Sequence, residues 1–232
     1  MKYIGIIAAM TEEVAAIEKL MQDIKINNIY ELTFIEGRIH DKEVVLVKSG
    51  VGKVNAARTA QILIDNYKLD YIINVGTAGG LKEDIEIGDL VIADKLVQHD
   101  FDITAWGHEK GYITDLGRYF YSNKDLINKS KKIMEHLNED FNTFIGTIAT
   151  GDIFIQDVNV KEKIKDEFNP ACTEMEGAAI AQICTLDNIP FVVIRSISDN
   201  ANNGAHMDFE KFTPIGVKNS TFILKTMLNK LQ

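Results

Sequence analysis

The stretch from Ala171 to Asn202 constrains the fold of this chain more than any other part of the sequence. Its pattern predicts a short strand ending in acids, an alanine-rich helix, and a second, buried strand that ends at Ser198 and Asp199. Arg195 stands inside this second apolar run. A buried guanidinium without a partner is strongly unfavourable, so we expect a carboxylate beside it. Two hypotheses follow: a ligand site at the strand ends, or a structural ion pair between neighbouring strands.

The rest of the chain alternates between strand and helix patterns. Apolar runs rich in β-branched residues predict strands at Tyr3–Ala9, Tyr30–Gly37, Glu43–Val47, Tyr71–Val75, Asp89–Asp94 and Phe144–Ala149. Amphipathic patterns predict helices from the N-cap Thr11 to Met21, after the turn at Ser49–Gly52, and at Lys124–Leu137, Lys161–Glu167 and Asp208–Leu231. This order predicts a single domain over residues 1–232, a three-layer α/β/α sandwich around a mixed twisted β-sheet.

Composition narrows the possible partners. The net charge of −9 argues against a nucleic-acid or anionic-membrane surface. The N-terminal apolar run is short and is followed at once by acids, so we expect neither a signal peptide nor a membrane span, and the cytoplasm is the expected compartment. Cys172 and Cys184 are expected to be buried small hydrophobes without a disulfide. The scattered histidines lack metal-ligand spacing, so we expect no metal site.

Each candidate functional segment lies at the C-terminal end of a predicted strand. These segments are Glu13, Thr77–Gly80, Phe154–Ile155, Glu176 and Arg195–Asp199. Scattered ion pairs would have no reason to share one edge, whereas ligands of open α/β sheets bind at the carboxyl ends of strands. We therefore favour a ligand site, although Glu12 and Glu13 also suit the first turn of a helix.

Three other segments carry hypotheses of their own. The sequence S-G-V-G-K that begins at Ser49 lacks the spacing of a phosphate loop and predicts a tight strand-to-helix turn. The glycines of Gly76–Gly80 indicate either close approach of the backbone to a ligand or a bend before the next strand. The aromatic, irregular residues 98–122 are typical of a lid or an oligomer contact.

The chemistry of these residues favours hydrolysis of a glycosidic bond. Carboxylates in separate roles can protonate a leaving group and activate water against an oxocarbenium-like centre. Phe154 and Ile155 could sandwich a flat ring. An aspartate can donate a hydrogen bond when protonated and accept one when ionised, which suits a purine that leaves through a ring nitrogen.

Six segments occur in the order of one family: G-I-I-A-A-M-T-E-E-V, K-S-G-V-G-K-V-N-A-A, I-I-N-V-G-T-A-G-G-L, G-D-I-F-I, T-E-M-E-G-A-A-I-A and V-V-I-R-S-I-S-D. Over nearly its whole length the chain resembles the bacterial 5′-methylthioadenosine/S-adenosylhomocysteine nucleosidases of the nucleoside phosphorylase superfamily. The resemblance implies a nucleoside phosphorylase-like mixed-sheet fold, a homodimer and no cofactor. It also implies hydrolytic release of adenine from a thioribosyl nucleoside, and from 5′-deoxyadenosine.

The resemblance assigns the reacting groups to distant parts of the chain. Glu13 would activate the water, with Arg195 and Thr77 positioning it. Asp199 would protonate N7 of adenine. Thr77 stands where the family commonly has serine, so the hydroxyl is kept.

The resemblance also implies the substrate contacts. Glu176, with Met175, would hold the ribose hydroxyls, and the Ile155 backbone would contact the purine edge while Phe154 stacks on the ring. The other implied contacts are Ala9, Gly79, Ser198 and the lid residue Phe209. Ile103 and Trp106 would reach the 5′ pocket of the partner subunit. Trp106 replaces a smaller aromatic and Thr11 replaces an acid, and the tryptophan leaves the breadth of that pocket open.

Four alternatives differ in testable features. A purine nucleoside phosphorylase needs cationic groups that bind phosphate. The segment Ala9–Glu13 contains no cationic residue, and no arginine stands directly before Gly76. A futalosine-type or AMP nucleosidase would share the acids and differ in the 5′ pocket, which the sequence does not resolve. A non-catalytic nucleoside-binding protein would lack Glu13 or Asp199. An NAD-dependent dehydrogenase would have a third glycine after Gly52.

Overall fold

The computed structural model describes residues 2–134, 140–201 and 205–230. The strands are β1 (Tyr3–Ala8), β2 (Gln22–Ile29), β3 (Leu32–Ile39), β4 (Lys42–Lys48), β5 (Leu69–Gly80), β6 (Leu90–Gln98), β7 (Phe120–Tyr121), β8 (Thr143–Thr150), β9 (Cys172–Glu174) and β10 (Phe191–Asp199). The helices are α1 (Thr11–Glu18), α2 (Lys53–Asn66), α3 (Lys124–Met134), α4 (Val158–Phe168), α5 (Gly177–Leu186), α6 (Ala205–Lys230) and the short 3₁₀ helix η1 (Thr104–Trp106).

The strands form one mixed sheet that brings the ends of β1, β5 and β10 to a common edge. β1 and β10 both pair in parallel with β5. Pairing also closes part of the sheet into a ring, because β5 contacts β9 and β10, β10 contacts β6, and β8 bridges β6 and β9. Since parallel neighbouring strands end at the same edge of the sheet, Ala8, Gly80 and Asp199 lie together at that edge.

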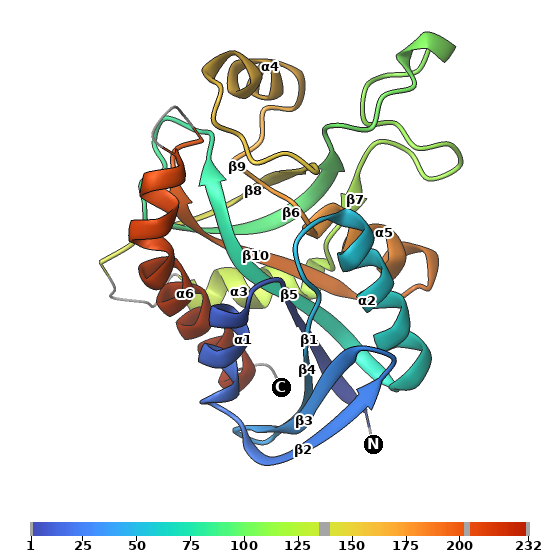
Figure 1. The fold of residues 1–232 in the computed structure, drawn as a ribbon, viewed down its shortest axis with the longest axis vertical. Helices are drawn as coiled ribbons and strands as arrows, with labels where there is room; N and C mark the ends of the chain where they lie inside the picture. The colour runs from blue at the N-terminus through green and yellow to red at the C-terminus, as the bar shows by residue number, and fades with distance from the viewer. Residues whose placement is uncertain (1, 135–139, 202–204, 231–232) are drawn as a thin grey trace.

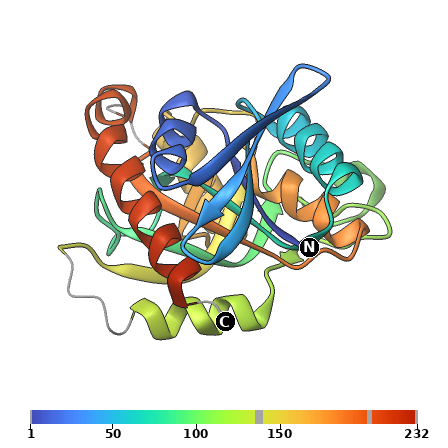
Figure 2. The ribbon, with the colours of Figure 1, turned by 90° about the horizontal axis from the view of Figure 1, so that it is seen from below.

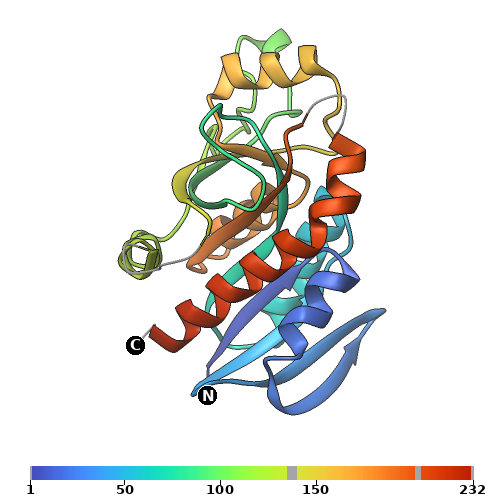
Figure 3. The same ribbon diagram turned by 90° about the vertical axis from the view of Figure 1, so that its left-hand side faces the viewer.

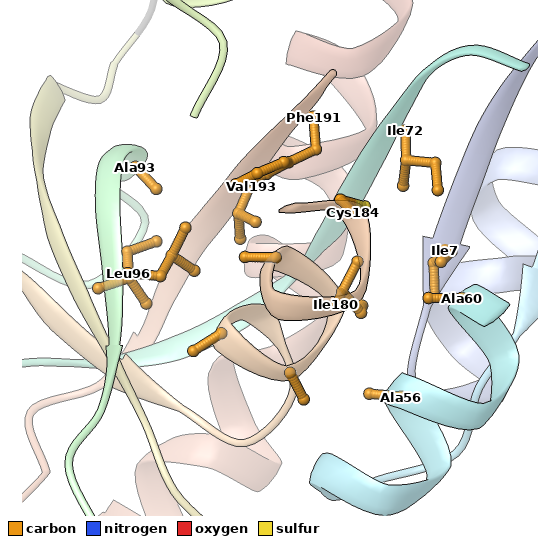
Figure 4. Packing of buried hydrophobic residues seen from close by; sticks show 14 of the residues in the cluster. Ile7, Ala56, Ala60, Ile72, Ala93, Leu96, Ile180, Cys184, Phe191 and Val193 are labelled. Carbon is orange, nitrogen blue, oxygen red and sulfur yellow. The ribbon is translucent and has the colours of Figure 1, made fainter. Parts of the chain in front are cut away.

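The two faces of the sheet bury separate hydrophobic clusters because strand side chains alternate between faces. Along β1, Ile7 faces the cluster under α2 and α5, whereas Ile4 and Ile6 face the cluster under α1, α3 and α6. Figure 2 shows α1 and α6 on one side of the strands and α2 and α5 on the other. Figure 4 shows the first cluster, with Ala56 of α2 and Ile180 of α5 packed over the strands. The predicted three-layer α/β fold around a mixed sheet is confirmed.

Helix α6 is the longest of the described helices and runs across one face of the sheet. Its 26 residues contact β5, β10 and α1, and Figure 3 shows it passing α1 along the body of the molecule. Its first turn therefore lies near the carboxyl ends of the strands. No described helix combines the length and the apolar character that a membrane span requires.

Some details of the secondary structure differ from the prediction. Met10, not Thr11, is the N-cap of α1, and this helix ends at Glu18 instead of Met21. Of the two hypotheses for Gly76–Gly80, the bend is not found, because the segment continues β5. Strand β2 was not predicted, because its sequence Q-D-I-K-I-N-N-I is polar and almost fully exposed at the sheet edge.

Some predictions fall partly outside the described residues. The helix expected at Lys124–Leu137 is described to Met134 and the one expected to reach Leu231 to Lys230, and Asn202 is likewise outside the described residues. Both cysteines are buried and free, as predicted.

Candidate active site

A cavity of about 300 Å³ opens at the edge where β1, β5, β9 and β10 end. Loops after β1 and β8 and the first turn of α6 complete its wall. The predicted residues that line it are Ala9, Glu13, Thr77, Gly79, Phe154, Ile155, Met175, Glu176, Arg195, Ser198, Asp199 and Phe209. Segments from both ends of the chain therefore share one cavity of a size suited to a small organic ligand.

Glu13 is held in the first turn of α1 by backbone N–H groups. Its Oε2 accepts hydrogen bonds from the N–H groups of Ala9 at 3.0 Å and Met10 at 2.9 Å. Its Oε1 accepts one from the Thr77 N–H at 3.2 Å. Burial raises the pKa of Glu13, while these hydrogen bonds and the charge of Arg195 oppose the rise. The carboxylate is thus fixed in orientation and is shielded from bulk water.

Arg195 pairs with a carboxylate, as the sequence predicts, and the partner is Glu174. Arg195 Nη2 lies 2.5 Å from Glu174 Oε2 and 2.6 Å from Asn74 Oδ1. Both charged side chains are almost fully buried. Glu176 Oε2 lies farther from Nη2, at 4.0 Å. Arg195 therefore forms the structural ion pair of one hypothesis, and it also lines the cavity where the other hypothesis places a ligand.

Gly76 leaves the space between Glu13 and Arg195 open. A Cβ atom at this position would come within 3.0 Å of Glu13 Oε1 and 3.4 Å of Arg195 Nη1. A side chain here would crowd both charged groups. The next residue, Thr77, contacts Glu13 through its backbone N–H, and its side chain lies against Gly216 of α6.

Asp199 lies at the end of β10 with its carboxyl oxygens held by local donors. Ser198 Oγ donates to Asp199 Oδ2 at 3.0 Å, and the Ala201 N–H donates to Oδ1 at 2.8 Å. Burial raises the pKa of Asp199 in spite of these hydrogen bonds. A Cβ at Gly79 would come within 2.9 Å of Oδ1, so only glycine lets β5 pass this close to the carboxyl group.

Glu176 precedes α5 and faces the N-terminus of α2. Its Oε1 accepts a hydrogen bond from the Gly52 N–H at 2.9 Å. Burial, followed by repulsion from Glu174, raises the pKa of Glu176 to about 7. Gly52 has a φ of 98°, a conformation that glycine adopts without strain.

Aromatic and aliphatic side chains form the remaining wall. The rings of Phe154 and Phe209 meet edge to face with centroids 5.7 Å apart, so the loop after β8 contacts the first turn of α6. Ile155 is buried, whereas Phe154 is partly exposed. This wall can cover a flat ring, and its aromatic residues are the pair predicted to act as stacking surface and lid.

Ile103 and Trp106 do not line the cavity. Trp106 ends η1 and is 77% exposed. Figure 1 shows the green segment that follows β6 projecting away from the sheet. Their predicted contact with a partner subunit stays a prediction.

Sequence reasoning did not assign Glu174, which lines the cavity, or Asn74, which lies behind it and accepts a hydrogen bond from Arg195. The other unassigned lining residues include Met10, Val51, Ile153, Ala201, His206 and Glu210. Glu174 also accepts from the Thr150 hydroxyl and from the N–H groups of Glu176 and Gly177, so it orders the start of α5. The signal was present, because T-E-M-E places two acids at one strand end and the buried arginine demanded a partner. Among the described residues no group of three or more metal-ligating side chains is arranged to hold a metal ion.

Sequence comparison identifies relatives over almost the whole chain. The family model of the Phosphorylase superfamily matches residues 3–229. A 5′-methylthioadenosine/S-adenosylhomocysteine nucleosidase from Staphylococcus aureus (strain JH9) is 40% identical over 229 residues, covering 98% of this chain and 100% of the relative.

Solved structures share the fold. A 5′-methylthioadenosine/S-adenosylhomocysteine nucleosidase from Colwellia psychrerythraea 34H in complex with adenine matches with a TM-score of 0.96 at 38% identity, covering 99% of this chain and 96% of that one. The futalosine hydrolase of Helicobacter pylori strain 26695 matches with a TM-score of 0.94 at 33% identity, covering 99% and 98%.

Proposed function

The chain belongs to the Phosphorylase superfamily and, within it, to the 5′-methylthioadenosine/S-adenosylhomocysteine nucleosidases, and we propose that Glu13 and Asp199 divide its reaction between them. The enzyme hydrolyses the N-glycosidic bond of these nucleosides and releases adenine. One observation carries the division of labour: two buried carboxylates from opposite ends of the chain line the same cavity.

Glu13 acts as the general base in this proposal. Its fixed carboxylate takes a proton from a water molecule, and the water oxygen forms a bond to C1′ of the ribose. Arg195 and Thr77 position this water. The open space at Gly76, between Glu13 Oε1 and Arg195 Nη1, supports that assignment.

Asp199 acts as the general acid. As the bond between C1′ and the purine breaks, its electron pair moves onto the base, and Asp199 donates a proton to N7. Burial raises the pKa of Asp199, which favours the protonated form that this step requires. The products are neutral adenine and the 5-thioribose derivative. Both carboxyl groups then return to their starting states by proton exchange with solvent.

Glu176 holds the 2′ and 3′ hydroxyls of the ribose, beside Met175. Oε1 accepts the Gly52 N–H, which orients the carboxylate, and both oxygens keep lone pairs that can accept from the sugar hydroxyls. Ile155 and Phe154 hold the purine, and Phe209 covers it; Ala9, Gly79 and Ser198 complete the contacts. Neither a metal nor a cofactor enters this scheme.

Phosphorolysis is the first alternative. Inorganic phosphate would need cationic groups beside the sugar. Among the described cavity residues, the buried cation Arg195 is already neutralised by Glu174, and Glu13 and Glu176 would repel the phosphate. Water is therefore the favoured nucleophile.

A futalosine-type substrate is the second alternative, since the Helicobacter pylori futalosine hydrolase has the same fold. Such a substrate would use the same acids and differ only at the 5′ position. The 40% identity with a methylthioadenosine/adenosylhomocysteine enzyme over the full chain favours the thioribosyl nucleosides.

The assembly and the compartment are further parts of the proposal. The enzyme acts as a homodimer in which Ile103 and Trp106 reach the 5′ pocket of the partner subunit. The exposure of Trp106 supports this role. The cytoplasm stays the compartment expected from the sequence.

The decisive assay measures adenine release from methylthioadenosine with and without phosphate. We expect equal rates and no ribose 1-phosphate. A phosphate requirement would establish phosphorolysis instead. No adenine release from methylthioadenosine, together with base release from a futalosine, would change the assigned substrate but not the proposed chemistry.

A further inference from the structure

The S-G-V-G-K segment before α2 binds carboxylates of the protein itself. The Gly52 N–H donates to Glu176 Oε1 at 2.9 Å, and the Lys53 N–H donates to Asp152 Oδ1 at 2.8 Å. These free N–H groups of a helix N-terminus attract anions. The segment therefore uses the chemistry of a phosphate loop to hold two protein carboxylates, one of them in the active site.

Lys53 ties this helix end to the strand edge through its side chain. Its ammonium group lies 2.6 Å from Asp100 Oδ1 and 3.1 Å from Gln98 Oε1. The other oxygen of Asp100 accepts the Asp152 N–H at 2.9 Å. Lys53 and Asp152 are thus joined twice, once directly and once through Asp100, in a closed ring of hydrogen bonds.

The far side of this ring is firmly anchored. The Gly151 N–H donates to the carbonyl oxygen of Glu174 at 3.0 Å. The buried imidazole of His99 packs so closely on Gly151 that a Cβ there would come within 2.3 Å of His99 Nε2. The contact between Lys53 and Asp100 therefore fixes the start of α2 relative to the closely packed backbone around His99 and Gly151.

The ion pair differs from an ordinary surface pair in burial and in connection. The side chains of Lys53 and Asp100 are only 17% and 18% exposed. Burial alone would raise the pKa of Asp100, but the hydrogen bonds from Lys53 and the Asp152 N–H lower it overall, so the carboxylate is ionised. The Gly52 N–H and the Lys53 N–H are separated only by the φ and ψ angles of Gly52, and both donate to carboxylates, so a shift of Lys53 displaces the neighbouring Gly52 N–H.

We propose that Lys53, paired with Asp100, is a positioning residue that holds the start of α2 so that the Gly52 N–H keeps the Glu176 carboxylate aimed at the ribose hydroxyls. This inference rests on the proposed role of Glu176 and adds the device that orients it. A side chain that contacts the substrate loses affinity when it is displaced even slightly, so it depends on neighbouring residues that hold it in place.

The test is a set of steady-state measurements on Lys53→Met, Glu176→Gln and the double variant. We expect Lys53→Met to raise KM for methylthioadenosine about tenfold, as loss of one hydrogen bond to a charged group would do. Inhibition by adenine, which lacks the sugar, should change less than about twofold. In the Glu176→Gln background, Lys53→Met should add less than about a further twofold.

Two variants calibrate this result. Arg58→Met removes another cation from α2, whose partner Glu31 is 87% exposed, and it should leave KM unchanged. Lys53→Arg keeps the charge and should restore most of the affinity for methylthioadenosine. If Lys53→Met does not fold, Lys53→Gln replaces it in the same cycle.

The outcomes separate the inference from the proposed function. A normal KM in Lys53→Met, equal weakening of adenine and methylthioadenosine, or full multiplication of the two effects in the double variant would overturn the positioning role alone. A normal KM in Glu176→Gln would overturn the assignment of Glu176 and the inference with it.

Discussion

Arg195 and Glu174 form a buried ion pair at the centre of the strand ends, with Nη2 and Oε2 2.5 Å apart. Asn74 and the carbonyl oxygen of Ile194 accept the other hydrogen bonds of the guanidinium. Glu174 in turn orders the first turn of α5, where Glu176 stands. One ion pair therefore supports the start of α5 and also forms part of the cavity wall.

Replacing Arg195 with methionine should destabilise the protein strongly. The substitution leaves the Glu174 carboxylate buried without its counter-ion, which costs about 3–5 kcal/mol. Urea unfolding followed by circular dichroism measures this loss. The double variant Arg195→Met, Glu174→Gln removes both charges and should recover much of the stability, but not the activity. Equal stability of the single variant and the wild type would contradict the pairing.

Asp199→Asn should lower turnover strongly and leave the fold intact. The asparagine oxygen can still accept the Ala201 N–H, and the Ser198 hydroxyl can accept from the new amide, but no proton is available for N7. We expect adenine release to fall by about 10²–10⁴. The circular dichroism spectrum and the affinity for methylthioadenosine should stay close to wild type. Near-normal turnover would rule out Asp199 as the acid.

Glu13→Gln should remove the base at a small cost in stability. Its amide group cannot accept all the N–H groups that the carboxylate accepts, since one former acceptor becomes a donor facing Thr77. Turnover should fall by about 10²–10⁴, measured as adenine release. Glu12→Gln is the matched control, because Glu12 is the neighbouring acid in the same turn and is exposed. Comparable losses of turnover in both variants would mean that Glu12 and Glu13 only stabilise the first turn of α1.

The sequence predicts at which edge of the sheet the site lies, but it does not predict that some of the strands close into a ring. Buried strands followed by helices place Glu13 and Asp199 on a common edge, because β1 and β10 run parallel to β5. Glu176 reaches this edge from β9, which pairs antiparallel with β5. The ring from β5 through β10, β6, β8 and β9 depends on long-range pairings that no local pattern encodes.

The sequence also does not decide which of several similar side chains forms a given contact. Glu174 and Glu176 lie two residues apart, and only the packed structure decides which of them pairs with Arg195. The strand β2 escaped prediction because Ile24 and Ile26 alternate with polar residues and are exposed, so the segment lacks the buried apolar run that predicted the other strands. The capping of α1 escaped it because the Glu13 carboxylate, rather than the Thr11 hydroxyl, accepts the free N–H groups.

Glu176→Gln should make the protein more stable at neutral and alkaline pH while impairing its affinity for methylthioadenosine. Burial raises the pKa of Glu176 from 4.5 to about 7, so between these values the folded state binds more protons than the unfolded chain. The stability of the wild type therefore falls as pH rises through this window, by up to about 3 kcal/mol. Glutamine carries no such penalty, and its oxygen can still accept the Gly52 N–H.

The measurement compares urea unfolding of Glu176→Gln and wild type at about pH 4.5 and about pH 8. The two proteins should be similar in acid, and the variant should be the more stable above pH 7 by an amount that then stays constant. Glu162→Gln, at an exposed site on α4, should show no such divergence. A difference that is the same at both pH values would mean that Glu176 ionises normally, and burial of its carboxylate would then carry no stability cost.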